Sequence, residues 1–464
     1  MIKNTAFYWA RIAIIFGILT ICKGEGQTSD SRQTRKSFRG SMRVFNLSGD
    51  VSMPHENGAE DPLSSDSQRA GRGRPNTIEN DTPKPDDKIS EAVIEALGFF
   101  ARKQHADGYW QETSSPVAHT GLVILSYLSY GVTHEKALHK ETEPYTENVK
   151  RALDWLVDQM GDNGDLQDNG RMYDQAMGTY ALAEAYMVTQ DEKLKEPLQK
   201  ALDWLVKNQI QSTGGWRYHP VPNEENEGGD LSVSGWVIAA LVSGKNAGAK
   251  VPPEVFEKAG AFVMSQRRAN GAFAYKFDGK GGKLTMSSVG MFCLQLLGEE
   301  VMGPLAAGSA FNTDGGGESN NNGAYRKRIK ETADLLMENI PDVSQLKDPG
   351  FKWPFYYCYY ATFAMRIFGG EPWVVWRDAL NSRLVGLQVK DVSDDDADND
   401  PDNLGSWKQK GTGSQGTGRI VTTAWIVLTL MAPERGVLIP KPPIILGPGG
   451  QKPPIILGPG GQKP

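Results

Sequence analysis

The chain has 464 residues, of which 39% are hydrophobic and 23% charged, so it is long and apolar enough to bury a sizeable core. Its 56 acidic and 50 basic residues give a formal charge of −6, and this lack of basic excess argues against nucleic-acid binding. Three cysteines, Cys22, Cys293 and Cys358, are too few for a disulfide framework or a multi-cysteine zinc site, and we expect Cys293 and Cys358 to be small buried thiols.

The first 24 residues are typical of an export signal. Lys3 and Arg11 precede an apolar run over residues 12–21, which is too short to cross a bilayer as a helix. Cleavage after Gly24, lipid attachment at Cys22 and an uncleaved anchor are the three outcomes that the pattern allows. We therefore expect a periplasmic or extracellular protein that meets a membrane only through this segment.

Two polar or proline-rich segments flank the body of the chain. Residues 25–88 are rich in Ser, Asp, Arg, Gly, Asn and Pro without hydrophobic periodicity, which predicts a disordered linker. Residues 441–464 contain the undecapeptide KPPIILGPGGQ twice, and its proline density excludes a helix. The folded body is therefore expected over residues 89–440.

The body contains an internal repeat. The phrase ALDWLV occurs at residues 152–157 and 201–206, and a glutamine follows each copy. Glutamines followed by glycine and mostly by an aromatic residue recur along the body, with successive spacings of 55, 50 and 57 residues among the first four. Such a period indicates stacked supersecondary units. The glutamines are Gln104, Gln159, Gln209, Gln266, Gln345 and Gln388.

Each repeat predicts two helices. An amphipathic helix precedes the glutamine, as in the unit that places Val149, Ala152, Leu153 and Leu156 on one face. A more uniformly apolar helix follows the turn; such helices are expected to start near Val117, Tyr173, Leu231, Met286, Tyr356 and Thr422. Helices that are polar on one side belong outside and apolar helices belong inside. Six pairs therefore predict an all-α fold, an α6/α6 toroid of two concentric helical rings.

The Gln-x-x-x-Gly-x-Trp type of turn between two helices resembles the repeat of squalene and oxidosqualene cyclases and of protein prenyltransferase β subunits. The resemblance covers about residues 89–440. The segments 172–174 (Met-Tyr-Asp), 214–218 (Gly-Gly-Trp-Arg-Tyr) and 230–236 (Asp-Leu-Ser-Val-Ser-Gly-Trp) also resemble exported bacterial toroid proteins of the squalene cyclase-like and prenyltransferase-like kind. The resemblance implies a closed toroid and, as one function, terpenoid cyclase or prenyltransferase chemistry.

The motifs of that superfamily are incomplete here. Protonating cyclases use Asp-x-Asp-Asp at an inner-helix start, where this chain keeps only Asp230; an N-cap and a proton donor are both open interpretations. The prenyltransferase zinc segment has Ser232 in place of its cysteine, and the His-Thr pair at His119 precedes Asp230 instead of following it. We therefore expect no zinc, no other resident metal and no cofactor.

An acidic run over residues 391–402 interrupts the last turn. Residues 394–398 match the Asp-Asp-x-x-Asp pattern of ionising terpene synthases, but a run this dense matches at many offsets. Asp396, Asp398 and Asp400 alternate as in calcium loops, although Pro401 stands where the turn glycine belongs. A solvated acidic loop is the expected structure.

Polar and aromatic residues gather at the expected inner-helix starts, which face one mouth in a closed ring. Helix N-termini there favour an anionic or hydroxylated ligand, although the same side chains also serve as caps and packing residues. This group of polar and aromatic residues contains most of the ligand-binding candidates, together with Thr120, Thr285, Ser287, Thr422 and Thr423. The candidates are His119, Tyr173, Trp216, Tyr218, Ser232, Trp236, Tyr356, Tyr357 and Tyr360.

Three functions follow as hypotheses. The first is a toroid that binds a small apolar or hydroxylated ligand, or a protein partner, in its central cavity without the known catalytic motifs. The second is an active isoprenoid cyclase or prenyltransferase with Asp230 as the acid. The third is a carbohydrate-processing α6/α6 enzyme, which needs two carboxylates roughly 5–10 Å apart across the cavity, and Asp174 and Asp230 are the natural pair.

Overall fold

The computed structural model describes residues 87–166, 171–220, 228–276, 281–308, 319–348, 351, 353–408 and 418–433. The chain divides into two units, Met1–Ile78 and Glu79–Pro464, and all the described residues belong to the second. The expected export signal, the linker up to residue 86 and the C-terminal tail lie outside the described residues. Asp87 and Lys88, which were expected in the linker, open the first helix.

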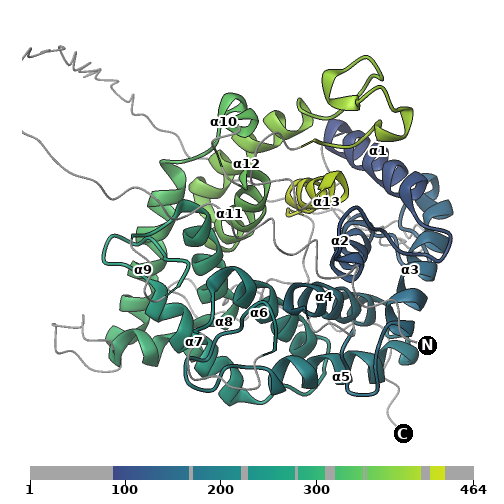
Figure 1. The fold of residues 1–464 in the computed structure, drawn as a ribbon. Coiled ribbons are helices and arrows are strands. Elements are labelled where there is room, and N and C mark those ends of the chain that lie inside the picture. Colours follow the sequence, from purple (N-terminus) through teal and green to yellow (C-terminus); the bar gives the residue numbers. More distant parts are fainter. Residues whose placement is uncertain are drawn as a thin grey trace, which may run out of the picture. The chain divides into compact units, whose positions relative to one another are not determined.

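Six helices form the inner ring (Figure 1). Each contacts the next along the chain and the last returns to the first, which closes the ring. They begin within four residues of the predicted starts, and the described residues contain isolated β-bridges but no strand. The all-α α6/α6 toroid is therefore confirmed. The inner helices are α2 (Pro116–Ser129), α4 (Met172–Thr189), α6 (Leu231–Asn246), α8 (Leu284–Gly308), α11 (Pro354–Phe368) and α13 (Gly418–Leu430).

Six outer helices surround this ring (Figure 1), and each precedes its inner partner in the chain. They are α1 (Asp87–Lys103), α3 (Thr146–Asp158), α5 (Glu192–Lys207), α7 (Pro253–Gln266), α9 (Ser319–Met337) and α12 (Gly370–Val385). Shorter helical segments complete the connections: η1 (Lys140–Tyr145), α10 (Val343–Lys347), η3 (Asp395–Ala397) and η4 (Pro401–Asn403). None of the described helices is long and apolar enough to cross a membrane.

Burial separates the two rings as the hydrophobic pattern predicted. In α3, the buried residues form a single stripe, Val149, Ala152, Leu153 and Leu156, and most of the remaining residues are polar. In α6, by contrast, every residue from Leu231 to Gly244 is buried. A helix that is apolar on every side can bury its whole surface only when other helices surround it. This is why α6 and the other apolar helices form the inner ring.

The repeated glutamines join each hairpin to the next one. Gln209 donates from its side-chain amide to Gly214 O at 2.9 Å, in its own turn, and to Val255 O at 3.0 Å, in the next outer helix. Gln104 bonds in the same way to Gly108 O and to Asn148 O of α3, and Gln388 to Gly405 O and to Ala92 O of α1. Each glutamine thus pairs a carbonyl of its own turn and adds a second hydrogen bond to a carbonyl in the next outer helix, which ties the two units together.

Three units depart from the predicted use of glutamine. Gln159 is exposed, and Gln175 from α4 makes the equivalent bonds to Gly164 O and Ala201 O. In the fourth unit Thr332 of α9 donates to Gly271 O at 2.8 Å. Gln345 belongs instead to the capping box of α10. The inter-unit bond is thus kept in both the second and fourth units, although a different side chain supplies it.

Glycine and tryptophan complete the turn for separate physical reasons. Gly214 has φ +82°, and a Cβ added there would lie 2.2 Å from Lys258 O of the next outer helix. Trp216 is buried, and its indole N–H donates to Leu205 O at the end of α5 at 2.9 Å. The glycine therefore permits close contact between units, and the tryptophan seals the end of its own outer helix.

Candidate functional site

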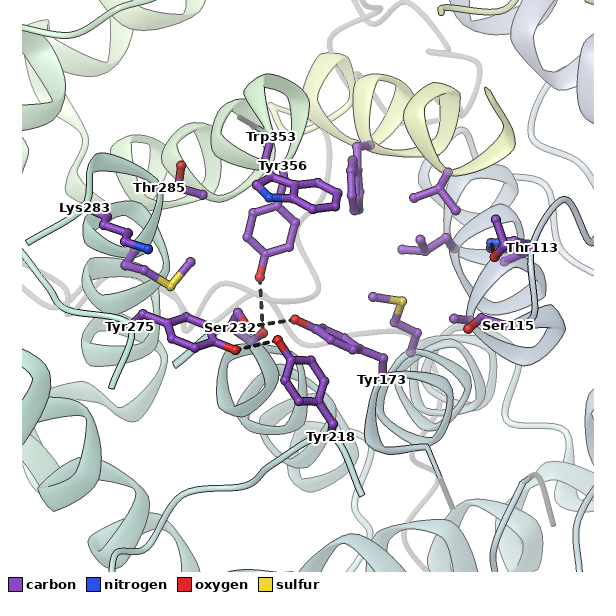
Figure 2. A pocket seen from close by; sticks show the side chains of 17 residues that line it. Thr113, Ser115, Tyr173, Tyr218, Ser232, Tyr275, Lys283, Thr285, Trp353 and Tyr356 are labelled. Atoms are coloured by element: carbon purple, nitrogen blue, oxygen red, sulfur yellow. Dashed lines mark hydrogen bonds between the residues drawn. The ribbon is translucent and has the colours of Figure 1, made fainter. Parts of the chain in front are cut away.

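A cavity of about 760 Å³ lies among the first turns of the inner helices (Figure 2). All six inner helices, or the residues just before them, contribute side chains to its wall. Its volume falls within the range of roughly 300–1,000 Å³ that small-molecule sites occupy. The lining residues are Thr113, Ser115, Ala118, His119, Leu122, Tyr173, Met177, Tyr218, Ser232, Tyr275, Lys283, Thr285, Met286, Trp353, Tyr356, Val421 and Trp425.

The wall is apolar where the helices run deeper into the ring. Leu122 of α2, Met177 of α4 and Trp425 of α13 lie at least one turn beyond the helix starts and are almost fully buried. Trp425 also meets the ring of Tyr356 edge-on, with 5.3 Å between the ring centroids. These side chains present an apolar surface that can hold the hydrocarbon part of a ligand.

Aromatic hydroxyls form the polar part of the wall (Figure 2). Tyr173 donates its hydroxyl to Ser232 Oγ at 2.8 Å, and Tyr356 donates to Ser232 O at 3.2 Å. The hydroxyls of Tyr218 and Tyr275 are hydrogen-bonded to each other. Burial raises the pKa of Tyr173 and of Tyr356 well above the usual value, so both phenols keep their protons and act as donors.

Asp230 is fully buried and caps α6. Its Oδ1 accepts the backbone N–H of Val233 at 2.9 Å and the hydroxyl of Ser232 at 2.7 Å. Burial is the main cause that raises the pKa of this carboxyl, while the two hydrogen bonds oppose the rise. Asp230 does not line the cavity, and the N-cap interpretation is confirmed. Ser232 connects it to the hydroxyl of Tyr173 on the wall.

Asp174 caps a neighbouring helix instead of its own. Its Oδ1 accepts the backbone N–H of Ala118, in the first turn of α2, at 3.0 Å. Burial raises the pKa of Asp174 to about 6, and the bond from Ala118 opposes this rise. Like Asp230, it does not line the cavity. The two carboxylates expected to face a substrate thus lie behind the wall, each bound to the start of an inner helix.

His119 and the small hydroxyl residues beside it have different roles. His119 lines the cavity. Its Nδ1 accepts the backbone N–H of Glu112, and its Nε2 shares a hydrogen bond with Thr113 Oγ1. Burial lowers the pKa of His119 to about 4, so its imidazole is neutral at neutral pH. Thr120 instead accepts the backbone N–H of Trp110, and Thr423 does the same for Trp407, so both stabilise the turns.

Four of the nine ligand-binding candidates do not line the cavity. Trp216 seals α5, and Tyr357 points away from the cavity to donate to Asn339 O at 3.0 Å. Trp236 stacks on Tyr359, and Tyr360 packs edge-on against Phe292. Each helical residue turns by about 100° from its neighbour, so a position close to the helix start does not ensure that a side chain faces inward. The other five candidates, His119, Tyr173, Tyr218, Ser232 and Tyr356, do line it.

The structure adds wall residues that the sequence reasoning missed. Tyr275 follows Phe273 by two residues, as Tyr218 follows Trp216, so a comparison of the repeats could have found it. Lys283 stands immediately before α8, and another basic residue, Arg171, holds the same place before α4. Trp353 has φ +64° and is 36% exposed, and no sequence signal indicates that backbone conformation.

The remaining candidate groups are structural. Asp398 pairs with Lys408 and Arg419, and Asp400 pairs with Lys103 of α1 at 3.1 Å, so the acidic run contacts the first helix as well as solvent. No cluster of three or more metal-binding side chains occurs in the part of the chain that the structure describes. Cys293 and Cys358 are buried free thiols, and burial raises the pKa of each.

Similar solved structures share this fold. The unsaturated glucuronyl hydrolase of Bacillus sp. GL1 aligns with a TM-score of 0.53 and 13% identity over 75% of this chain and 98% of its own. An inactive variant of an α-1,6-mannanase of Salegentibacter sp. HEL1_6, solved with α-1,6-mannotriose, aligns with a TM-score of 0.50 and 11% identity over 75% of this chain and 98% of its own. A variant of the type II terpene cyclase MstE of Scytonema, solved with geranylgeranyl dihydroxybenzoate, aligns with a TM-score of 0.44 and 14% identity over 75% of this chain and 98% of its own.

The likenesses to the glucuronyl hydrolase and the mannanase support the α6/α6 toroid of this chain. Identities of 11% and 13% carry the fold alone, and these two alignments span three quarters of the chain. Neither a known protein family nor a curated protein matches the sequence.

Proposed function

We propose that this protein binds one small molecule, with an apolar body and at least one polar group, in the cavity at the starts of its inner helices. The observation that carries the proposal is the composition of the wall. Apolar side chains line its deeper part, aromatic and aliphatic hydroxyls, His119 and Lys283 supply its polar groups, and no carboxylate is among the described residues that line it. Small-molecule sites typically combine an apolar surface with a few convergent polar groups.

The placement of the two aspartates favours binding over carbohydrate hydrolysis. Glycoside hydrolysis normally needs two carboxyl groups that flank the scissile bond. Asp174 and Asp230 are instead both fully buried and each accepts a backbone N–H at a helix start. A substrate in the cavity would therefore meet neither carboxylate directly.

A proton-transfer enzyme is the second candidate, because one observation favours it. Tyr173 donates to Ser232, which donates to Asp230, so a chain of two hydrogen bonds links the wall to a buried carboxyl group. Asp230→Asn keeps an oxygen that can cap α6 but removes the ionisable group. If the variant converts the bound molecule as fast as the wild type does, this candidate is excluded; a loss of conversion with unchanged binding supports it.

The binding proposal is tested by identifying what the protein carries. The full chain is purified under native conditions, extracted with organic solvent, and the extract is analysed by mass spectrometry. We expect one compound, or one homologous series, near one equivalent per chain. Thr285→Trp, which places a bulky ring on the cavity wall, should abolish co-purification. The matched control Thr213→Trp lies in an exposed turn outside the wall and should leave it unchanged.

If wild type and Thr285→Trp yield the same extracts, the cavity is not the binding site. Export is a separate proposal that rests on residues 1–24. Fractionation of cells that make the full chain, with the intact mass of the product, tests it, because cleavage after Gly24 and lipidation at Cys22 give different masses.

A further inference from the structure

We propose that the ligand is an amphiphile with one anionic end, which lies beside Lys283 at the starts of α8 and α11, while its apolar body lies against α2 and α4. This inference rests on the proposed function and adds the charge and the direction of the ligand. The anionic group is a carboxylate or a phosphate, since both offer the acceptor oxygens and the negative charge that this part of the wall favours.

The first observation is the charge of the cavity. Among the described residues that line the cavity, Lys283 is the one cationic side chain, because the low pKa of His119 keeps its ring neutral. Its ammonium group lies 5.7 Å from the centre of the Tyr275 ring, and it forms no ion pair with any described residue. A cation on a wall without carboxylates creates a positive potential, which attracts an anion.

The second observation is how the inner helices are capped. Carboxylates bind the first amides of three of them: Asp174 those of α2, Asp230 those of α6 and Glu112 those of α13. The first amide of α4, from Met172, donates to Tyr218 O. α11, like α4, has no side-chain cap, and among the described residues no carboxylate binds the start of α8.

α8 and α11, whose starts bind no carboxylate of the described residues, lie side by side and form one part of the wall. α8 contacts α11, and the first intrahelical bond of α8 runs from Ser287 N to Lys283 O, so the amides between these residues have no helical partner. The positive ends of both helices therefore add to the charge of Lys283. Thr285, in the first turn of α8, offers a hydroxyl on the same side of the cavity.

A third observation is a buried donor without an acceptor. Trp425 lines the cavity and is 3% exposed, and its indole N–H has no hydrogen-bond partner among the described residues. Its ring packs against Tyr356 in the first turn of α11. Buried N–H groups are nearly always bonded, so this donor calls for an acceptor from a molecule in the cavity.

The opposite side of the ring suits the apolar body. Six inner helices in a closed order place α2 and α4 across from α8 and α11 (Figure 1). Ala118, Leu122 and Met177 line the cavity there. Asp174 lies behind this side, and its pKa of about 6 leaves it negatively charged at neutral pH, which disfavours a second anion. The anionic end of the ligand therefore lies at α8 and α11 and its apolar body at α2 and α4.

The test compares three probes of equal chain length: dodecanoate, dodecyl phosphate and dodecanol. Binding to the purified, delipidated full chain is measured by isothermal titration calorimetry, with quenching of tryptophan fluorescence as a second readout. We expect at least one anion to bind roughly tenfold or more tightly than the alcohol, because a charge-assisted hydrogen bond replaces a neutral one. The preferred anion identifies the headgroup as carboxylate or phosphate.

Lys283→Gln should remove this preference, so that the anions bind no more tightly than dodecanol. Lys245→Gln is the matched control, since the Lys245 ammonium also lies over an aromatic ring, that of Phe256 at 5.3 Å, but outside the cavity wall. Lys283→Arg should keep the preference. Equal affinities of the wild type for all three probes would overturn the inference. A preference for an anion that survives in Lys283→Gln would overturn it as well. Both outcomes would leave the proposed function standing. If no probe binds and nothing co-purifies, both proposals fail.

Discussion

At the scale of single residues, most polar side chains at the inner-helix starts satisfy backbone groups. Ser234 and Ser287 accept the N–H groups of Trp216 and Phe273, just as Thr120 and Thr423 do in their own units. Buried backbone groups are costly when they lack partners, so a fold with six interior turns needs many such side chains. The residues left for a ligand are those that the backbone does not already use.

Gln209→Ala should lower the free energy of unfolding by about 1–3 kcal/mol, since it leaves the carbonyl of Gly214 without this donor and removes the bond that ties Gln209 to Val255 O of the next outer helix. Gln159→Ala is the matched control: Gln159 holds the same repeat position but is exposed, and the change should stay within about 0.5 kcal/mol. Urea unfolding followed by circular dichroism measures both. Equal losses would contradict the structural role of the glutamine.

Asp174→Asn should stabilise the protein at pH 8 but not at pH 4. The pKa of Asp174 is about 6 in the folded chain against an ordinary 3.8, so ionising it works against folding. That cost is absent below about pH 4, grows as the pH rises to about 6 and stays constant above, where it amounts to about 1–3 kcal/mol. The asparagine keeps an oxygen for the Ala118 N–H and carries no charge.

Unfolding free energies of wild type and Asp174→Asn, measured between pH 4 and pH 8, test this. A stability difference that does not change with pH would show that the burial of the charge is not its cause.

At the scale of the element, the repeated unit is a hairpin whose turn is adapted to the neighbouring outer helix. The glycines of five turns, Gly108, Gly164, Gly214, Gly271 and Gly405, have positive φ and lie directly against the backbone of the next outer helix. The glycine thus serves two needs at once, because it allows a left-handed conformation and a close approach. This explains why the repeat signal concentrates in the turn.

Gly214→Ala should therefore be much more destabilising than Gly248→Ala. Both glycines have positive φ, +82° and +90°, so both alanines carry the conformational cost of roughly 1–2 kcal/mol. Only at Gly214 does the added Cβ meet backbone, at 2.2 Å from Lys258 O, whereas nothing lies within 4 Å at Gly248. We expect an additional loss of about 2 kcal/mol or more at Gly214 in chemical denaturation. Similar losses would mean that φ alone matters.

At the scale of the described unit, closure of the ring depends on contacts between its last and first hairpins. Gln388 donates to Ala92 O, Lys103 pairs with Asp400, and Glu112 accepts the N–H of Ile420 at the start of α13. The acidic run thus lies where the chain returns to its beginning. Because these contacts join residues about 300 positions apart, they can form only after the hairpins between them have stacked.

Glu112→Ala should loosen this junction more than the rest of the toroid. It removes the carboxylate that binds the start of α13, a loss comparable to that of a helix cap, about 1–2 kcal/mol. Hydrogen exchange with peptide resolution should show faster exchange in α13 and α1, with α5 and α6 unchanged. A uniform increase over all helices would indicate global destabilisation instead of a local opening.

The sequence by itself determined the double ring of helices. Hydrophobic period, turn glycines and repeat spacing are local properties, and closure into a ring lets six such helix pairs bury their apolar faces without an exposed end. It also indicated the mouth where Tyr173, Ser232 and Tyr356 meet. Only the tertiary structure decided which side chains reach the cavity. Tyr356 lines it while Tyr357 bonds to Asn339 O, and Asp174 caps a helix from another hairpin. Side-chain direction depends on helix rotation and on neighbours distant in sequence, which no local pattern encodes.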